Sequence, residues 1–124
     1  MNLEAVGIAS KDIKESIKFY EAFGVEFSKS GEGHYEGLAS NGVRVMLDSV
    51  DLMKKINPDW SYRESSNITL CHKCDSPSDV DVIFSKVIVK GFEAVKSPWD
   101  AFWGQRYASV KDPDGNQIDI FAEL

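Results

Sequence analysis

The stretch WGQRYASVKDPDGNQIDIF, residues 103–121, decides the fold of this 124-residue chain. Two runs of strand-forming residues, 105–111 and 117–123, flank the turn sequence DPDGN, a pattern typical of a β-hairpin. The second run places an acid, Asp119, between two isoleucines. Burying an unpaired carboxylate costs several kcal/mol. Asp119 therefore either lies on a solvated face or belongs to a site.

The same order of elements occurs twice along the chain. Residues 10–24 and 75–91 each predict an amphipathic helix that ends at a glycine, Gly24 or Gly91, and these glycines lie about half a chain length apart. The candidate capping residues are Ser10, Asp12 and Ser76, and Pro77 occupies the first helical position of the second helix. Each helix follows one β-rich run and precedes three more, so both halves have the order β, α, β, β, β.

This repeat predicts one domain, 1–124, made of two modules. Module one covers about 1–50, a linker with a short helix covers about 51–65, and module two covers about 66–124. The strands predicted for the two modules are residues 3–9, 24–27, 34–39 and 43–49, then 67–73, 91–95, 105–111 and 117–123.

The fold class expected from this pattern is α+β. Two paired βαβββ modules form a curved eight-stranded mixed sheet, with the helices on its convex face and an open cleft on the other. Side chains alternate along a strand, which places Met46 and Asp48 on the cleft face of the fourth strand and Asp119 and Phe121 on that of the last. Tyr107 faces the cleft by the same rule.

Composition excludes several classes of partner. The net charge is −6 and no block of Lys or Arg occurs, so neither nucleic acid nor an anionic membrane is expected as a partner. A neutral or cationic small ligand fits better. The chain starts without a basic signal region and holds no apolar run of about 18 residues, so we expect a cytoplasmic protein. The motif CHKC, 71–74, lacks a second ligand pair and is interpreted as structural.

The paired βαβββ order, the SIKFYEAFG helix and above all the DPDGN turn resemble the vicinal oxygen chelate superfamily. This is the group of glyoxalase I, bleomycin-resistance protein and the extradiol dioxygenases, and the resemblance covers essentially the whole chain. It implies one divalent metal held from the first, fourth, fifth and eighth strands. The corresponding positions here are Ala5, Met46, Asn67 and Asp119. Alanine and methionine offer no hard donor, so no metal and no cofactor are expected.

The leading functional hypothesis is therefore metal-free sequestration of a small aromatic molecule, neutral or cationic, resembling the bleomycin-resistance branch. Aromatic residues are dense in the segments predicted as loops or linkers: Trp60, Tyr62, Trp99, Phe102 and Trp103. The predicted ligand-binding residues are Met46, Asp48, Trp99, Trp103, Tyr107, Asp119 and Phe121. No catalytic residue is assigned.

Two alternatives stay open. One is a metal-dependent lyase, isomerase or dioxygenase with a rearranged site, and the other is an interaction module whose Trp99 and Trp103 form an interface instead of lining a pocket. The resemblance also implies a homodimer, in which modules pair either within one chain or across the dimer. Arg44 is expected to pair with Asp48 or Asp119.

Overall fold

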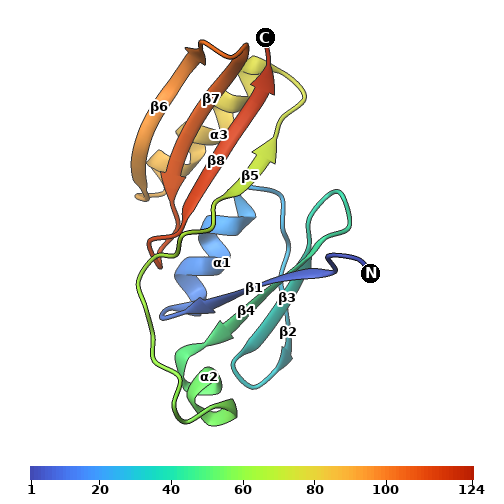
Figure 1. The fold of residues 1–124 in the computed structure, drawn as a ribbon, viewed down its shortest axis with the longest axis vertical. Helices are drawn as coiled ribbons and strands as arrows, with labels where there is room; N and C mark the ends of the chain where they lie inside the picture. The colour runs from blue at the N-terminus through green and yellow to red at the C-terminus, as the bar shows by residue number, and fades with distance from the viewer. The chain divides into compact units, whose positions relative to one another are not determined.

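The computed structural model describes residues 1–124 and has eight strands and three helices. The chain divides into two compact units, residues 1–63 and 64–124. Each unit contains a βαβββ module whose strands form one four-stranded mixed sheet (Figure 1). The α+β class and the repeated module are therefore confirmed, with the eight strands divided equally between two sheets.

The first unit has the strand order β1-β4-β3-β2 in its sheet. β1 runs parallel to β4, and the β2–β3 and β3–β4 pairs are antiparallel. A short helix, α2, follows β4 directly, as predicted for the linker. The elements are β1 (Ala5–Ser10), α1 (Ile13–Glu21), β2 (Ser28–Gly31), β3 (His34–Leu38), β4 (Arg44–Ser49) and α2 (Val50–Ile56).

The second unit repeats this topology, with the strand order β5-β8-β7-β6 and the parallel pair β5–β8. Its antiparallel strands β7 and β8 have the bounds predicted from the sequence. The elements are β5 (Leu70–Lys73), α3 (Pro77–Val89), β6 (Glu93–Ala101), β7 (Gln105–Lys111) and β8 (Gln117–Glu123).

The helix α1 begins at one of its two candidate caps. The carboxylate of Asp12 accepts a hydrogen bond from the amide of Glu15, which would otherwise lack a helical partner. Ser10 instead lies in β1, and its buried hydroxyl is 2.6 Å from that of Ser16. Ser10 therefore ties α1 to β1 and does not cap the helix.

The helix α3 begins as predicted. Ser76 accepts a hydrogen bond from the amide of Asp79, and Pro77 occupies the first turn, where its missing N–H has no cost. None of the helices combines the length and apolar character needed to cross a bilayer.

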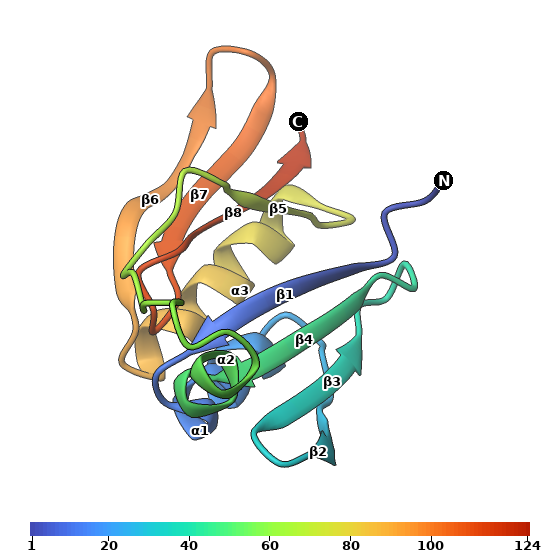
Figure 2. The ribbon, with the colours of Figure 1, turned by 60° about the horizontal axis from the view of Figure 1, so that its bottom comes forward.

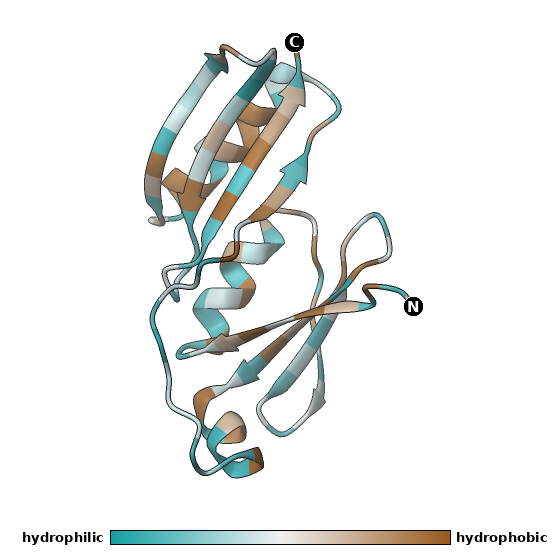
Figure 3. Ribbon diagram, in the orientation of Figure 1, coloured by the Kyte–Doolittle hydropathy of each residue, from teal (hydrophilic) through white to brown (hydrophobic).

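The sheet of the second unit has one dry face. α3 lies across β6, β7 and β8 (Figure 2), and the apolar side chains of β7 and β8 that face it are fully buried. Apolar and polar bands alternate along β8 (Figure 3), as the period of a strand requires. The buried residues on these elements include Val80, Val87, Ala108, Val110, Ile118, Ile120 and Ala122. The predicted alternation is correct, and the opposite face is left to polar and aromatic side chains.

Three predicted strands differ from the structure by three residues or more. Residues 24–27 do not form a strand, because Val25 turns into the core and is only 1% exposed, and β2 starts at Ser28. β5 starts at Leu70, which leaves Asn67 exposed in the preceding loop. β6 continues through Ser97–Pro98 to Ala101. Proline is tolerated there because β6 is an edge strand with irregular pairing to β7.

Gly37 marks a close approach of backbone segments in the first unit. A Cβ atom at this position would lie 2.5 Å from the carbonyl oxygen of Glu26 and 2.6 Å from Cγ1 of Val25. At Gly7, in contrast, a Cβ atom would meet only the flexible end of Met46, at 3.5 Å. The two glycines thus form a matched pair for a packing test.

We predict that Gly37→Ala lowers the free energy of unfolding by about 1–3 kcal/mol, because a backbone carbonyl cannot move aside without distorting the sheet. The measurement is urea denaturation followed by circular dichroism. Gly7→Ala, the control, should change the same quantity by less than about 0.5 kcal/mol. Equal effects of the two substitutions would contradict this account of the packing.

Candidate functional site

Five aromatic side chains gather on the second unit and form what we call the aromatic face: Trp99, Phe102, Trp103, Tyr107 and Phe121. Strand register places three of them in one row, because Trp99 of β6 pairs with Tyr107 of β7, which pairs with Phe121 of β8. The neighbouring residue Arg106 points to the other side, where it donates to Asp81 of α3. The aromatic face is therefore the side of the sheet that α3 leaves open.

The rings of the aromatic face form a continuous series. The ring centroids are 5.4 Å apart for Trp99 and Trp103, 5.3 Å for Trp103 and Tyr107, and 5.9 Å for Tyr107 and Phe121. The first two pairs meet edge to face and the last is stacked. Both arrangements are favourable for aromatic quadrupoles. The series thus offers both ring faces and ring edges to a flat ligand.

The exposed end of the aromatic face is the β6–β7 turn. Phe102 is 91% exposed and Trp103 is 48% exposed, although both are large apolar residues. Gly104 follows them at φ +93°, a conformation that favours glycine and closes the turn. The indole N–H of Trp103 donates to Oε1 of Gln105 at 2.8 Å, which orients the ring.

Asp119 lies beside Tyr107 on this face and is only 7% exposed. Three side chains donate hydrogen bonds to its carboxylate: the hydroxyls of Tyr107 at 2.6 Å and Ser109 at 2.7 Å, and the amide of Gln117 at 3.0 Å. The acid between two isoleucines is thus buried and satisfied. Burial, together with the hydrogen bond to Asp119, raises the pKa of the Tyr107 hydroxyl. Tyr107 therefore stays protonated and acts as a donor at neutral pH.

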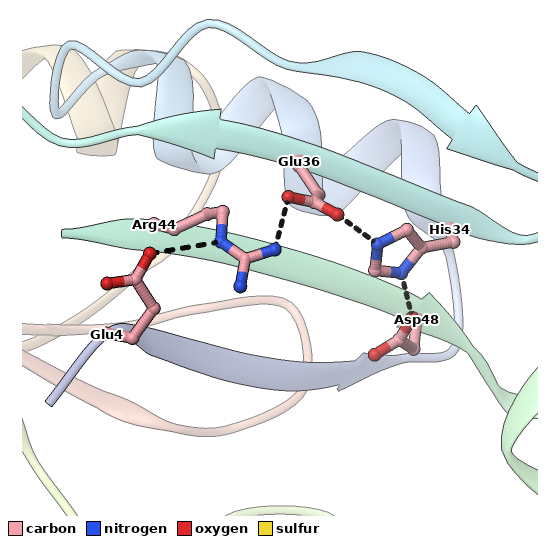
Figure 4. A network of polar contacts seen from close by, with 5 residues as sticks. All are labelled: Glu4, His34, Glu36, Arg44 and Asp48. Carbon is pink, nitrogen blue, oxygen red and sulfur yellow. Dashed lines mark hydrogen bonds and ion pairs between the residues drawn. The ribbon is translucent and has the colours of Figure 1, made fainter. Parts of the chain in front are cut away.

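The open face of the first unit carries a polar network that joins β3 and β4 and extends to Glu4, just before β1 (Figure 4). Arg44 of β4 donates to Glu36 of β3 at 2.7 Å and lies 4.0 Å from the carboxylate of Glu4. The predicted pairing of Arg44 with Asp48 or Asp119 was therefore wrong. Asp48 lies four residues after Arg44 on the same face of β4, and the strand register places it opposite His34 instead.

His34 lies between two carboxylates. Its Nδ1 contacts Asp48 and its Nε2 lies 2.6 Å from Glu36 (Figure 4). The hydrogen bonds to Asp48 and Glu36 raise the pKa of the His34 imidazole, and Arg44, followed by His34, lowers the pKa of Glu36. The ring of His34 thus lies between the two carboxylates, with one ring nitrogen hydrogen-bonded to each of them.

The donor set does not fit the metal that the family resemblance implies. Ala5 and Met46 have no hard donor, and Asn67 lies in an exposed loop before β5. Asp119 has its carboxylate occupied by three donors within its own sheet. Nowhere in the chain do three or more His, Cys, Asp or Glu side chains come together as a metal site.

The CHKC motif provides no such cluster either. Cys71 is exposed, Cys74 is buried, and both are free thiols. Burial lowers the pKa of the intervening His72, whereas burial raises that of the Cys74 thiol. The three side chains therefore occupy different environments.

The structure brings five of the predicted binding residues onto one sheet face: Trp99, Trp103, Tyr107, Asp119 and Phe121. The other two, Met46 and Asp48, lie in β4 of the first unit. Trp99 was expected in a loop but belongs to β6. That these residues bind a ligand stays a prediction.

Sequence reasoning missed the network around His34. Its members are far apart in the sequence, and only the strand register brings His34 opposite Asp48. Strand alternation could have indicated part of this network. It places His34 and Glu36 on one face of β3, and Arg44 and Asp48 on one face of β4.

Comparison with known proteins identifies the fold. A family model described as the Glyoxalase/Bleomycin resistance protein/Dioxygenase superfamily matches residues 2–120. No curated protein sequence gives a significant match.

Solved structures with this fold are numerous. A glyoxalase-related enzyme from Fulvimarina pelagi has a TM-score of 0.85 at 18% identity, covering 98% of this chain and 88% of that one. A hypothetical protein from S. aureus has a TM-score of 0.83 at 18% identity, with coverage of 98% and 92%. A fosfomycin resistance protein from Listeria monocytogenes has a TM-score of 0.77 at 18% identity, with coverage of 100% and 94%. Identities this low show the fold alone.

We predict that Tyr107→Phe lowers the free energy of unfolding by about 1–3 kcal/mol, because the buried carboxylate of Asp119 loses a hydrogen-bond donor. Urea denaturation of the variant and the wild type measures the change. Tyr35→Phe, on β3 of the first unit, is the control and should have a smaller effect. An unchanged stability of Tyr107→Phe would mean that this hydrogen bond contributes little.

We predict opposite titrations for the two histidines. In NMR spectra recorded as a function of pH, His34 should titrate above the ordinary value of 6.5 and His72 below it. Each histidine provides the internal control for the other. Titration of both near the ordinary value would contradict the described environments.

The raised pKa of His34 also predicts a pH-dependent stability. The folded state holds the His34 proton more tightly than the unfolded state does. The resulting stabilisation of the folded state is fully present below the unfolded-state pKa of 6.5, and it is lost as the pH rises through the folded-state pKa. His34→Gln should therefore destabilise the protein more at pH 6 than at pH 9, measured by urea denaturation at each pH. A larger effect at pH 9 would overturn the assignment.

Proposed function

Because this chain belongs to the Glyoxalase/Bleomycin resistance protein/Dioxygenase superfamily, we propose that it binds and sequesters a small aromatic molecule without using a metal. The observation that carries the proposal is the aromatic face of the second unit. Its rings run in an unbroken series from the exposed turn at Trp103 to Phe121. Such a series offers a flat ligand several rings to stack against.

Energetics support an aromatic ligand in particular. Exposed apolar rings gain about 25 cal/mol for each Å² of apolar area that a ligand removes from water. Well-placed aromatic pairs add about 0.5–1.5 kcal/mol each. Phe102 is almost fully exposed and Trp103 is about half exposed. A ligand that covers these two rings therefore gains binding free energy from the apolar area it buries.

The chemistry of the site supports binding without a metal. The four positions that the resemblance assigns to the metal supply one carboxylate, Asp119, and its lone pairs already accept three hydrogen bonds. Lewis-acid chemistry needs several hard donors around one ion. The remaining groups on the aromatic face position and cover a ligand.

Relatives of the same fold support a small molecule as the ligand. The family description includes the bleomycin resistance protein, and one structural neighbour is a fosfomycin resistance protein. Both names connect this fold with resistance to small drugs. The likeness is in the fold, and the aromatic nature of the ligand rests on the residues of this chain.

The proposal is tested by isothermal titration calorimetry with a panel of neutral, cationic and anionic two-ring aromatic compounds, in buffer containing EDTA. At least one compound should bind, and Trp103→Ala should weaken binding by about tenfold or more. Because Trp103 is 48% exposed, this substitution should leave the fold intact, which circular dichroism checks.

The control is Trp60→Ala in the first unit. Trp60 lines a separate shallow depression of about 430 Å³, together with Asp59, Ser61 and Arg63. Binding that survives Trp103→Ala and is lost in Trp60→Ala would move the site to this depression. An absence of binding by the whole panel, or a turnover that appears only with a divalent metal, would overturn the proposal.

We further propose that the protein is a cytoplasmic homodimer. The general preference for two-fold assemblies supports the dimer. Analytical ultracentrifugation at micromolar concentration tests it, and a monomer alone would contradict it.

A further inference from the structure

The charged and hydrogen-bonding groups around the aromatic face are not balanced, because donors are left over and the acceptors are used. We propose that the ligand is an aromatic anion, such as a two-ring arene carboxylate, whose charged group lies against Lys96 while its rings stack on the aromatic face. This inference rests on the proposed function and names the class of ligand.

The acid on the face is unsuited to hold a cation. Oδ2 of Asp119 accepts from Tyr107, and Oδ1 accepts from both Ser109 and Gln117. The residue is also only 7% exposed. Three of the roughly four acceptor sites of the carboxylate are therefore used, and a cationic ligand could reach the remaining one only by giving up its hydration at a nearly buried position, which is unfavourable. The cationic ligand that the sequence analysis left open is therefore not favoured.

Other charged groups near the face are paired. Lys73 of β5 lies 3.9 Å from Glu123, and Lys111 of β7 lies 4.0 Å from Glu93. Within each pair the lysine and the glutamate offset each other's charge, and the two pairs lie at opposite ends of the sheet. They leave neither a free acid for a cation nor a free base for an anion.

Asp100 and Asp81 belong to the opposite side of the sheet, where both accept hydrogen bonds from Arg106. Beside the aromatic face, the carboxylates of Asp119, Glu93 and Glu123 each have a partner of their own. A ligand cation would have to compete with an existing partner at each of these three acids.

Lys96 is different. No carboxylate lies within ion-pair distance of its ammonium, and the contact it makes is with an aromatic ring, since Nζ lies 4.6 Å from the centroid of Trp99. The strand register places Lys96 opposite Ser109, the residue that donates to Asp119. Lys96 therefore stands at the border of the aromatic face with a positive charge that no acid offsets.

Trp99 supplies a second donor at the same place. Its indole N–H is buried and has no hydrogen-bond partner. Native structures rarely leave such a donor unpaired. Phe102 and Trp103 pack against this ring from the exposed turn, and Phe102 is 91% exposed, so a ligand can displace it at little cost in buried area.

A carboxylate matches these two donors. One oxygen would accept from the Lys96 ammonium and the other from the Trp99 indole, while the attached rings lie against Trp103 and Tyr107. A neutral arene would keep the stacking and leave both donors unused. A cationic arene would also meet the charge of Lys96, which repels it.

The test compares three ligands that share one naphthalene ring system and have small substituents by calorimetry: 2-naphthoate, 2-naphthalenemethanol and 2-naphthylmethylammonium. The naphthoate should bind about two- to fivefold tighter than the alcohol, as expected for one partly exposed ion pair, and the cation should bind most weakly. Raising the salt concentration should reduce the advantage of the naphthoate.

Two substitutions assign the effect to Lys96. Lys96→Gln should abolish the preference for naphthoate without changing the affinity for the alcohol, and Lys96→Arg should retain it. Lys111→Gln is the matched control, since Lys111 is a base on the neighbouring strand that is paired with Glu93, and it should leave all three affinities unchanged.

The outcomes separate this inference from the proposed function. If the alcohol binds and Trp103→Ala weakens it, but the naphthoate has no advantage or Lys96→Gln has no effect, the anionic ligand is overturned and the aromatic site stands. If none of the three compounds binds to the wild-type protein, the inference falls together with this form of the proposed function.

Discussion

The structure depends on one constraint: each four-stranded sheet carries the single helix of its βαβ crossover on one face. A parallel pair, β1–β4 or β5–β8, requires such a crossover, and its helix buries one side of the sheet. The other side must then be made of residues that tolerate water or that bind something. In the second unit this division separates the buried Ile118 and Ile120 from Asp119 and Phe121 of the same strand.

The two open faces solve the same problem in different ways. In the first unit, charged side chains pair across strands, so that His34, Glu36 and Asp48 satisfy one another. In the second unit, the carboxylate of Asp119 accepts hydrogen bonds from three donors, and the rings of the aromatic face occupy the neighbouring positions. The first solution resembles an ordinary solvated surface. The second leaves exposed rings and unpaired donors, and this is why we locate ligand binding there.

The repeated module did not preserve its chemistry. β4 and β8 occupy the same place in their sheets, yet the position of Asp119 in β8 corresponds to Met46 in β4. Methionine has no hard donor, so the two repeats present different chemistry at the same position of their sheets.

The sequence by itself determined the class of fold, the repeat, the bounds of β7 and β8, and the face on which Asp119 lies. These features follow from local rules, since helix periodicity, caps and strand alternation act between residues close in the chain. Trp99 was assigned to a loop but lies in β6, and the position of β6 at a sheet edge makes Pro98 acceptable within this strand.

The tertiary structure alone decided which polar groups meet. The pairing of His34 with Asp48, the three donors around Asp119 and the isolation of Lys96 all depend on strand register and on bulges. A shift of one residue would turn each of these side chains to the other face of its sheet. Contacts between strands distant in sequence cannot be read from local patterns, because many registers satisfy the same alternation and only the packed core selects one.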